Sequence, residues 1–223
     1  MKYLISDLIK VFKNIRFQTI LTILLFAINI QIITFFSDIE PTREFWARKI
    51  FYLHVPIAWS AFLGSFFVMM FGVLYLITKK EKWDKLSLSS AEVTLVFTSL
   101  ILITGPIWAK PVWGQPWSWE PRLTTTLILF LIYLGYFMVR GYTVSYELSA
   151  RLSAVVGIIA FIDIPIIYKS VTFWSPDAQA HPQTNNLDYG DSNIFIFSLF
   201  CFTILLINMI LVRFSTIKDT DVY

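Results

Sequence analysis

Hydrophobic residues along this chain come in six long runs, separated by short segments that hold most of the charged residues. The runs cover residues 17–36, 50–77, 88–109, 123–140, 152–169 and 193–213. Each run is long enough for an α-helix to cross the hydrocarbon core of a bilayer, which needs about 17–25 residues. The pattern predicts an all-α integral membrane protein with six transmembrane helices, forming a single polytopic membrane domain over residues 1–223.

The run at 50–77 is longer than a bilayer requires. At about 1.5 Å of rise per residue, a helix of this length exceeds a hydrocarbon core of roughly 30 Å. We therefore expect its first turns to stand outside the lipid.

Composition supports this class. Hydrophobic residues make up 57% of the 223 positions and charged residues only 15%, whereas soluble domains are nearer half apolar and a quarter charged. The net charge of +3 gives no reason to expect nucleic acid as a partner. The single cysteine, Cys201, excludes both an intramolecular disulfide and a Cys-x-x-Cys-His site for covalent haem. We expect no cleavable signal peptide, because the first run is too long and lacks a small-residue cleavage site.

The lysines and arginines predict the orientation. With six spans, 12 of the 18 fall on the side that holds both termini and six on the other side. Because short cytoplasmic loops are enriched in Lys and Arg, we expect both termini to face the cytoplasm. The basic segment 1–16 is expected to lie against the lipid of that leaflet.

The segment between the third and fourth runs is the most distinctive in the chain. Residues 113–124 read WGQPWSWEPRLT, with three tryptophans among seven residues. No helix or strand period fits the segment, which predicts an outward-facing loop. The flat aromatic side chains of this segment suit the binding of a planar ligand. The alternative interpretation is that the tryptophans belong to the belt of aromatic residues found at membrane interfaces.

Both histidines of the chain, His54 and His181, are expected on the same outward face as this loop. A neutral imidazole is a common metal ligand, and two imidazoles can occupy both axial positions of a haem iron. The alternative is that each ring only makes local hydrogen bonds. Ligation by both is favoured because they flank the tryptophan segment.

Two outward-facing arginines are the favoured candidates to bind the carboxylates of a ligand, since Arg can bind a carboxylate through two parallel hydrogen bonds. Arg122 lies within the tryptophan segment, and Arg48 lies about two turns before His54. Glu120 is expected to orient Arg122 or an indole N–H, or else to be a solvated loop acid.

An acidic residue, Asp163, falls inside the fifth run. Acids within a membrane are costly and suggest function. A structural role, capping a helix break before Pro165, is the alternative.

Residues 113–124 resemble the tryptophan-rich signature WGxxWxWDxRLT of haem-handling membrane proteins in cytochrome c maturation. The resemblance runs through Trp113, Gly114, Trp117, Trp119, Arg122, Leu123 and Thr124, and Glu120 stands where the signature has aspartate. Residues 52–59, YLHVPIAW, are similar to the Y-x-H-V-P-x-A-W run of these proteins, and residues 163–182 resemble the region that leads to their second histidine. Size and flanking sequence indicate the CcmC family.

The resemblance implies a bacterial inner-membrane protein that binds haem b without a covalent bond at the periplasmic face. It implies His54 and His181 as the iron ligands, with the tryptophan segment against the macrocycle. The implied partners are a periplasmic haem chaperone and the permease and ATPase subunits of an ABC-type complex. The implied chemistry is ligation and release of haem, so no enzymatic activity is expected.

Two functions of other classes remain open at this point. A b-type electron-transfer cytochrome would usually place histidine pairs inside the helix bundle, and this chain has only two histidines near one surface. A secondary transporter using Asp163 would be expected to show internal repeats, and the sequence shows none.

Overall fold

The computed structural model describes residues 14–37, 45–174 and 192–217, with only the backbone for 45–48. Within these ranges the chain forms six α-helices: α2 (Ile15–Phe35), α3 (Phe45–Thr78), α4 (Glu81–Trp113), α5 (Pro121–Tyr142), α6 (Tyr146–Phe173) and α7 (Ser192–Thr216). All six are long and apolar enough to span a membrane. The predicted six-helix membrane fold is therefore confirmed. Most of the basic segment at 1–16 lies outside the described residues.

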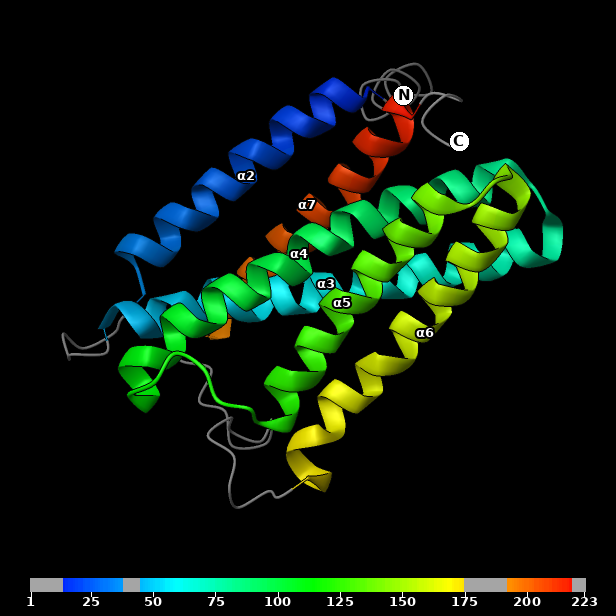
Figure 1. The fold of residues 1–223 in the computed structure, drawn as a ribbon. Coiled ribbons are helices and arrows are strands. Elements are labelled where there is room, and N and C mark those ends of the chain that lie inside the picture. Colours follow the sequence, from blue (N-terminus) through cyan, green and yellow to red (C-terminus); the bar gives the residue numbers. More distant parts are fainter. Residues whose placement is uncertain (1–13, 38–44, 175–191, 218–223) are drawn as a thin grey trace.

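The helices α3 and α4 form a long central hairpin (Figure 1). They have 34 and 33 residues, which corresponds to roughly 50 Å each, well beyond a hydrocarbon core of about 30 Å. The sequence indicated this excess length for α3 and missed it for α4. One end of both helices must therefore extend past the lipid.

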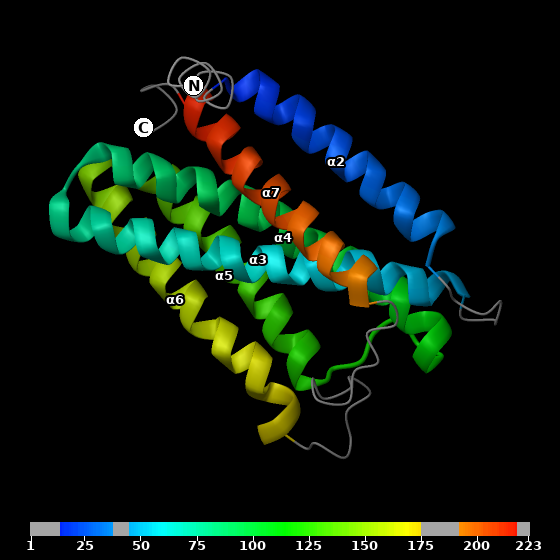
Figure 2. The ribbon, with the colours of Figure 1, turned by 180° about the vertical axis from the view of Figure 1, so that it is seen from behind.

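The other four helices pack as two pairs on either side of this hairpin (Figures 1 and 2). The α5–α6 pair contacts it on one side, and α7, with α2 beside it, contacts it on the other. The α5–α6 pair lies close to the hairpin near the turn between α3 and α4 and diverges from it toward the segment that joins α4 to α5 (Figure 1). This divergence leaves room between the two hairpins at the tryptophan end of the molecule.

Two buried apolar clusters hold the bundle together. One joins α3, α4 and α7 through Ile57, Ala61, Val93, Phe97, Ile101, Phe202, Leu206 and Ile210. The other joins α3, α4, α5 and α6 through Val68, Leu88, Ala91, Leu129, Tyr133, Tyr136, Ala160 and Ile167. Glycines allow the closest approaches, because a Cβ on Gly157 would lie 2.7 Å from Val68 and one on Gly64 would lie 2.3 Å from Thr94. Close packing of this kind drives helix association in lipid, where the hydrophobic effect between helices is absent.

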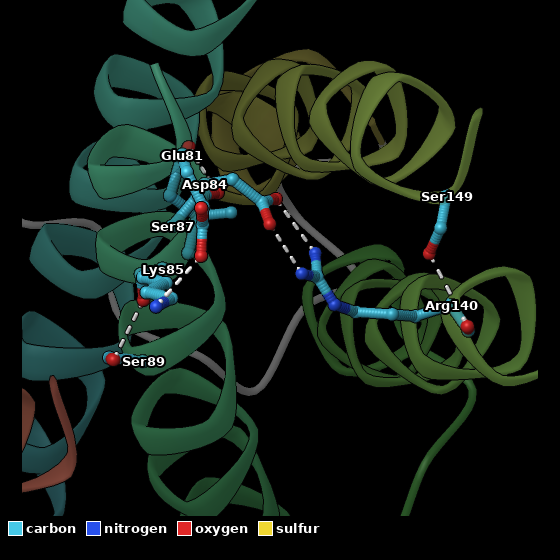
Figure 3. Close-up of polar contacts among 8 residues, drawn as sticks. Glu81, Asp84, Lys85, Ser87, Ser89, Arg140 and Ser149 are labelled. Carbon is cyan, nitrogen blue, oxygen red and sulfur yellow. Dashed lines mark hydrogen bonds and ion pairs between the residues drawn. The ribbon is translucent and has the colours of Figure 1, made fainter. Parts of the chain in front are cut away.

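Buried polar contacts supplement the packing at the end opposite the tryptophan segment. Asp84 on α4 binds Arg140 on α5 through two hydrogen bonds, and the Ser149 hydroxyl donates to the Arg140 carbonyl at 3.3 Å (Figure 3). Glu92 on α4 likewise pairs with Arg213 on α7. The sequence analysis identified neither ion pair.

The boundaries of the tryptophan segment differ from the prediction of a loop over residues 113–124. The helix α4 continues through two prolines to Trp113, and α5 begins at Pro121, so the connection is 114–120. Gly114 ends α4 because it adopts a positive φ of 80° and its N–H bonds to the Lys110 carbonyl at 3.0 Å. Pro121 starts α5, where its missing N–H costs no helical hydrogen bond.

The predicted alternative role of Asp163, capping a helix break before Pro165, is wrong. The helix α6 is continuous from Tyr146 to Phe173 and includes Pro165. Neighbouring helices in a membrane protein can accommodate such a proline without a break.

Candidate functional site

A cavity of about 490 Å³ lies at the tryptophan end, in the space where α5 and α6 diverge from the central hairpin. Its volume falls within the range of about 300–1,000 Å³ typical of small-molecule and cofactor sites. One stripe of α3 lines it at helical spacing: Phe51, His54, Val55, Ala58, Trp59 and Phe62. The other walls come from α4, α5, α6, α7 and the connection at 114–120. The lining is predominantly aromatic and aliphatic, which suits an apolar planar ligand.

His54 supplies the imidazole in this lining. Its Nδ1 lies 2.8 Å from the hydroxyl oxygen of Thr104 on α4. A Cβ on Gly105 would lie 3.4 Å from the Cε1 atom of His54, an ordinary van der Waals distance, so the ring edge lies beside Gly105. No hydrogen bond to His54 Nε2 is found within residues 14–37, 45–174 and 192–217. Because Nδ1 contacts Thr104, Nε2 is the ring nitrogen that a metal could bind.

Two of the three tryptophans in the segment line the cavity. Trp113, the last residue of α4, packs edge-to-face on Trp108 with the ring centroids 4.9 Å apart. Trp117 lines the cavity and packs edge-to-face on Trp119, with the centroids 5.6 Å apart. Trp119 does not line the cavity and is 75% exposed. Trp113 and Trp117 are thus each in contact with a second indole.

Arg122 is the one cation that the structure places in the lining of this cavity, considering the described side chains. Its guanidinium donates to the Tyr168 carbonyl on α6 at 3.2 Å. This bond joins the start of α5 to the last turns of α6. A carboxylate-bearing ligand would therefore meet a positive charge anchored to both helices.

Glu120 lies next to the cavity without lining it. It accepts a hydrogen bond of 2.9 Å from the Ser118 hydroxyl. The sequence analysis expected Arg122 or an indole N–H as its partner, and the Ser118 hydroxyl is a partner that it did not name. Its backbone carbonyl bonds to Thr124 N–H at 2.9 Å, which begins α5. Glu120 therefore shapes the connection to α5.

Two predicted site residues cannot be compared with this geometry. His181 lies outside the described residues. Arg48 lies in the first turns of α3, and the described part of the chain does not include its side chain.

The buried acid Asp163 is separate from the cavity. Its side chain is among the buried ones on α6, it is absent from the lining, and its Oδ2 has no hydrogen-bond partner among the described residues. The structure thus gives it no role in the site.

The sequence analysis missed several lining residues. Trp59 on α3 lines the cavity and donates its indole N–H to Thr203 on α7 at 3.1 Å. Trp108 and Tyr168 also line it. Trp59 lies five positions after His54, about 140° around the helix, so spacing from His54 alone would not have indicated it. Nothing in the spacing indicates Tyr168, because it comes from a distant helix.

The lining fits a haem group in its chemistry. It offers an imidazole with a free Nε2, two supported indoles and a guanidinium at the side. Groups of three or more His, Cys, Asp or Glu that could hold a free metal ion are absent from the described residues.

Comparison with known proteins identifies a family that matches nearly the whole chain. The family described as heme exporter protein C, CcmC, matches residues 6–219. Heme exporter protein C of Escherichia coli K12 is 30% identical over 168 residues, which is 74% of this chain and 68% of that protein. A putative cytochrome c biosynthesis ccmC-like mitochondrial protein of Marchantia polymorpha is 37% identical over 139 residues, 62% of this chain and 57% of its own length.

Heme exporter protein C of Bradyrhizobium diazoefficiens is 37% identical over 129 residues, covering 57% of this chain and 48% of that protein. The aligned part of the chain thus spans about half the length of the plant and Bradyrhizobium relatives.

Proposed function

Because this chain belongs to the heme exporter protein C family, we propose that it binds haem b in the cavity at the tryptophan end and delivers it to a periplasmic haem chaperone. The family supports a role in haem handling for cytochrome c biogenesis. The observation that carries the proposal is the convergence of four residues. His54, Trp113, Trp117 and Arg122 come from separate elements and line one cavity.

Each of these residues has a distinct task in the proposal. His54 would hold the iron through Nε2, and His181 would supply the second imidazole. The indoles of Trp113 and Trp117 lie against the macrocycle, where their flat apolar surfaces match it. Arg122 binds a propionate through charge-assisted hydrogen bonds, and Arg48 is the second candidate for this task.

The remaining members of the proposed site act through the connection. Gly114 turns the chain out of α4, so that Trp113 and Trp117 can face the same space. Trp119 supports Trp117 by its edge-to-face contact. Glu120 holds the connection through Ser118. When bound, haem would supply an iron atom that imidazole nitrogens can ligate.

The proposal is one of ligation and release. The imidazoles hold the iron, and a chaperone that competes for the iron or the macrocycle withdraws it. We further propose that the site faces the periplasm, with both termini in the cytoplasm of the inner membrane, as the 12-to-6 division of Lys and Arg indicates. The other partners in the proposal are membrane lipid and the permease and ATPase subunits of an ABC-type complex.

Absorption spectroscopy of the purified full-length protein tests this function. We expect a low-spin haem spectrum after expression with haem supply, and loss of that spectrum to the chaperone on mixing. Arg122→Gln should weaken the haem spectrum. Protein without haem, or haem that an excess of chaperone cannot remove, would contradict the proposal.

A further inference from the structure

The hydroxyl of Thr104 stands between His54 and a backbone carbonyl. Its oxygen lies 2.8 Å from His54 Nδ1 and 2.7 Å from the carbonyl oxygen of Leu100. Both distances are those of well-formed hydrogen bonds. Thr104 follows His54 by 50 positions in the sequence and lies on the neighbouring helix, α4.

Counting protons gives the direction of these bonds. The Leu100 carbonyl oxygen carries no hydrogen, so it can only accept. A threonine hydroxyl has one hydrogen to donate. When that hydrogen goes to Leu100, the hydroxyl oxygen can only accept from His54, which requires a hydrogen on Nδ1. A hydrogen on Nε2 instead would leave one of these two contacts without a proton.

Other threonines of α4 support donation to Leu100. The hydroxyls of Thr94 and Thr98 also donate to the carbonyl four residues earlier, at 2.7 and 3.0 Å. This back-bonding is common for threonine in helices. Thr104 makes the same bond and differs in that an imidazole also reaches its oxygen.

We propose that Thr104 is a positioning residue that holds His54 as the Nδ1–H tautomer, so that Nε2 is the nitrogen offered to an iron in the cavity. The proposal rests on the proposed haem-binding function. A β-branched side chain has few rotamers in a helix, which makes this hydroxyl a fixed acceptor. Partners that orient a metal-binding histidine typically change metal affinity about 10–100-fold when they are removed.

The tautomer can be measured directly in the protein without haem. Full-length protein labelled with ¹⁵N-histidine contains only two imidazoles, and His181→Gln leaves His54 alone. At mildly alkaline pH we expect the His54 spectrum to show a protonated Nδ1 and an unprotonated Nε2. A spectrum dominated by protonated Nε2 would overturn the proposal.

Hydroxyl variants test the consequence for haem. Thr104→Val keeps the shape and removes the acceptor, so we expect a mixture of tautomers and a haem affinity about 10–100-fold lower. Thr104→Ser, which restores the hydroxyl, should return both readouts toward wild type. Thr98→Val removes a back-bonded hydroxyl from the same helix away from the cavity and should change neither. An unchanged tautomer in Thr104→Val, or an equal loss in Thr98→Val, would contradict the proposal.

These readouts separate the two proposals. If the wild-type protein bound no haem, the proposed function would fail, and the spectrum of the haem-free protein would still decide the role of Thr104. If the protein bound haem while His54 carried its hydrogen on Nε2, the role of Thr104 alone would fail.

Discussion

Arg140 on α5 donates two parallel hydrogen bonds to the carboxylate of Asp84 on α4, of 2.8 Å to Oδ1 and 2.5 Å to Oδ2. Their side chains are only 8% and 2% exposed. The pair lies at the end of the bundle opposite the tryptophans, where α5 and α6 come close to the central hairpin (Figures 1 and 3). It thus helps to fix the angle at which the two hairpins diverge.

Removing one partner of this pair should destabilise the protein strongly. Asp84→Asn or Arg140→Met leaves a buried charge without its counter-charge, which typically costs about 3–5 kcal/mol. Unfolding in detergent, followed by circular dichroism, measures the change. Glu147→Gln breaks the exposed Glu147–Arg151 pair on α6 and should cost less than about 1 kcal/mol. Equal effects of the buried and exposed changes would show that the buried pair adds no specific stability.

The two histidines should have separable effects on the haem spectrum. Two imidazole ligands give a six-coordinate, low-spin iron, so His54→Ala and His181→Ala should each shift the spectrum toward high spin. The double variant should lose most of its haem. His54 should be the more sensitive, because a helix holds a ligand more rigidly than a loop. A single variant with full occupancy and a low-spin spectrum would remove that histidine from the ligand set.

Arg122 should contribute to haem affinity more than its charge alone explains. Arg122→Gln removes a charge-assisted contact worth about 1.5–3 kcal/mol, so haem should bind roughly 10–100-fold more weakly. Arg122→Lys should recover only part of this, because a lysine cannot form two parallel bonds. Titration of the protein with haem measures both. Lys110→Gln is the control, since Lys110 is an exposed cation at the same end and does not line the cavity. An equal loss of haem affinity in this variant would show that net charge, and not a specific contact of Arg122, accounts for the effect.

The carboxylate of Glu120 should matter for its charge and its bond to Ser118. Glu120→Asp should retain haem transfer to the chaperone. Glu120→Gln should impair transfer by removing a charge-assisted bond worth about 1.5–3 kcal/mol. Ser118→Ala should impair it in the same direction, since it removes the donor seen at 2.9 Å. Equal rates of haem transfer in the wild type and the three variants would show that the carboxylate of Glu120 has no role in transfer.

Fusion reporters test the orientation. Reporters placed after Pro116 or Ala178 should be active outside the cytoplasm, and reporters after Lys82 should be active inside it, because Lys and Arg divide 12 to 6 between the two sides. Cytoplasmic labelling of the tryptophan segment would separate the cavity from a periplasmic chaperone and would overturn the proposed function.

The sequence alone determined the class of fold and identified several of the residues that line the cavity. Insertion in lipid depends on the length and polarity of each segment, which are local properties, so the six helices could be predicted from their apolar runs. The tryptophans and His54 could be identified because their residue types are rare and suited to a planar, metal-containing ligand.

The tertiary structure decided which residues meet. Which helix faces pack together decides three features: where α4 ends, which residue pairs with Arg140, and that Tyr168 lines the cavity. Packing between helices in lipid arises from shape and a few polar contacts, since all the helices are similarly apolar. The contact between Thr104 and His54 could not be predicted from the sequence for the same reason. Thr104 lies 50 residues after His54, and only the packing of α3 against α4 brings its hydroxyl to the imidazole.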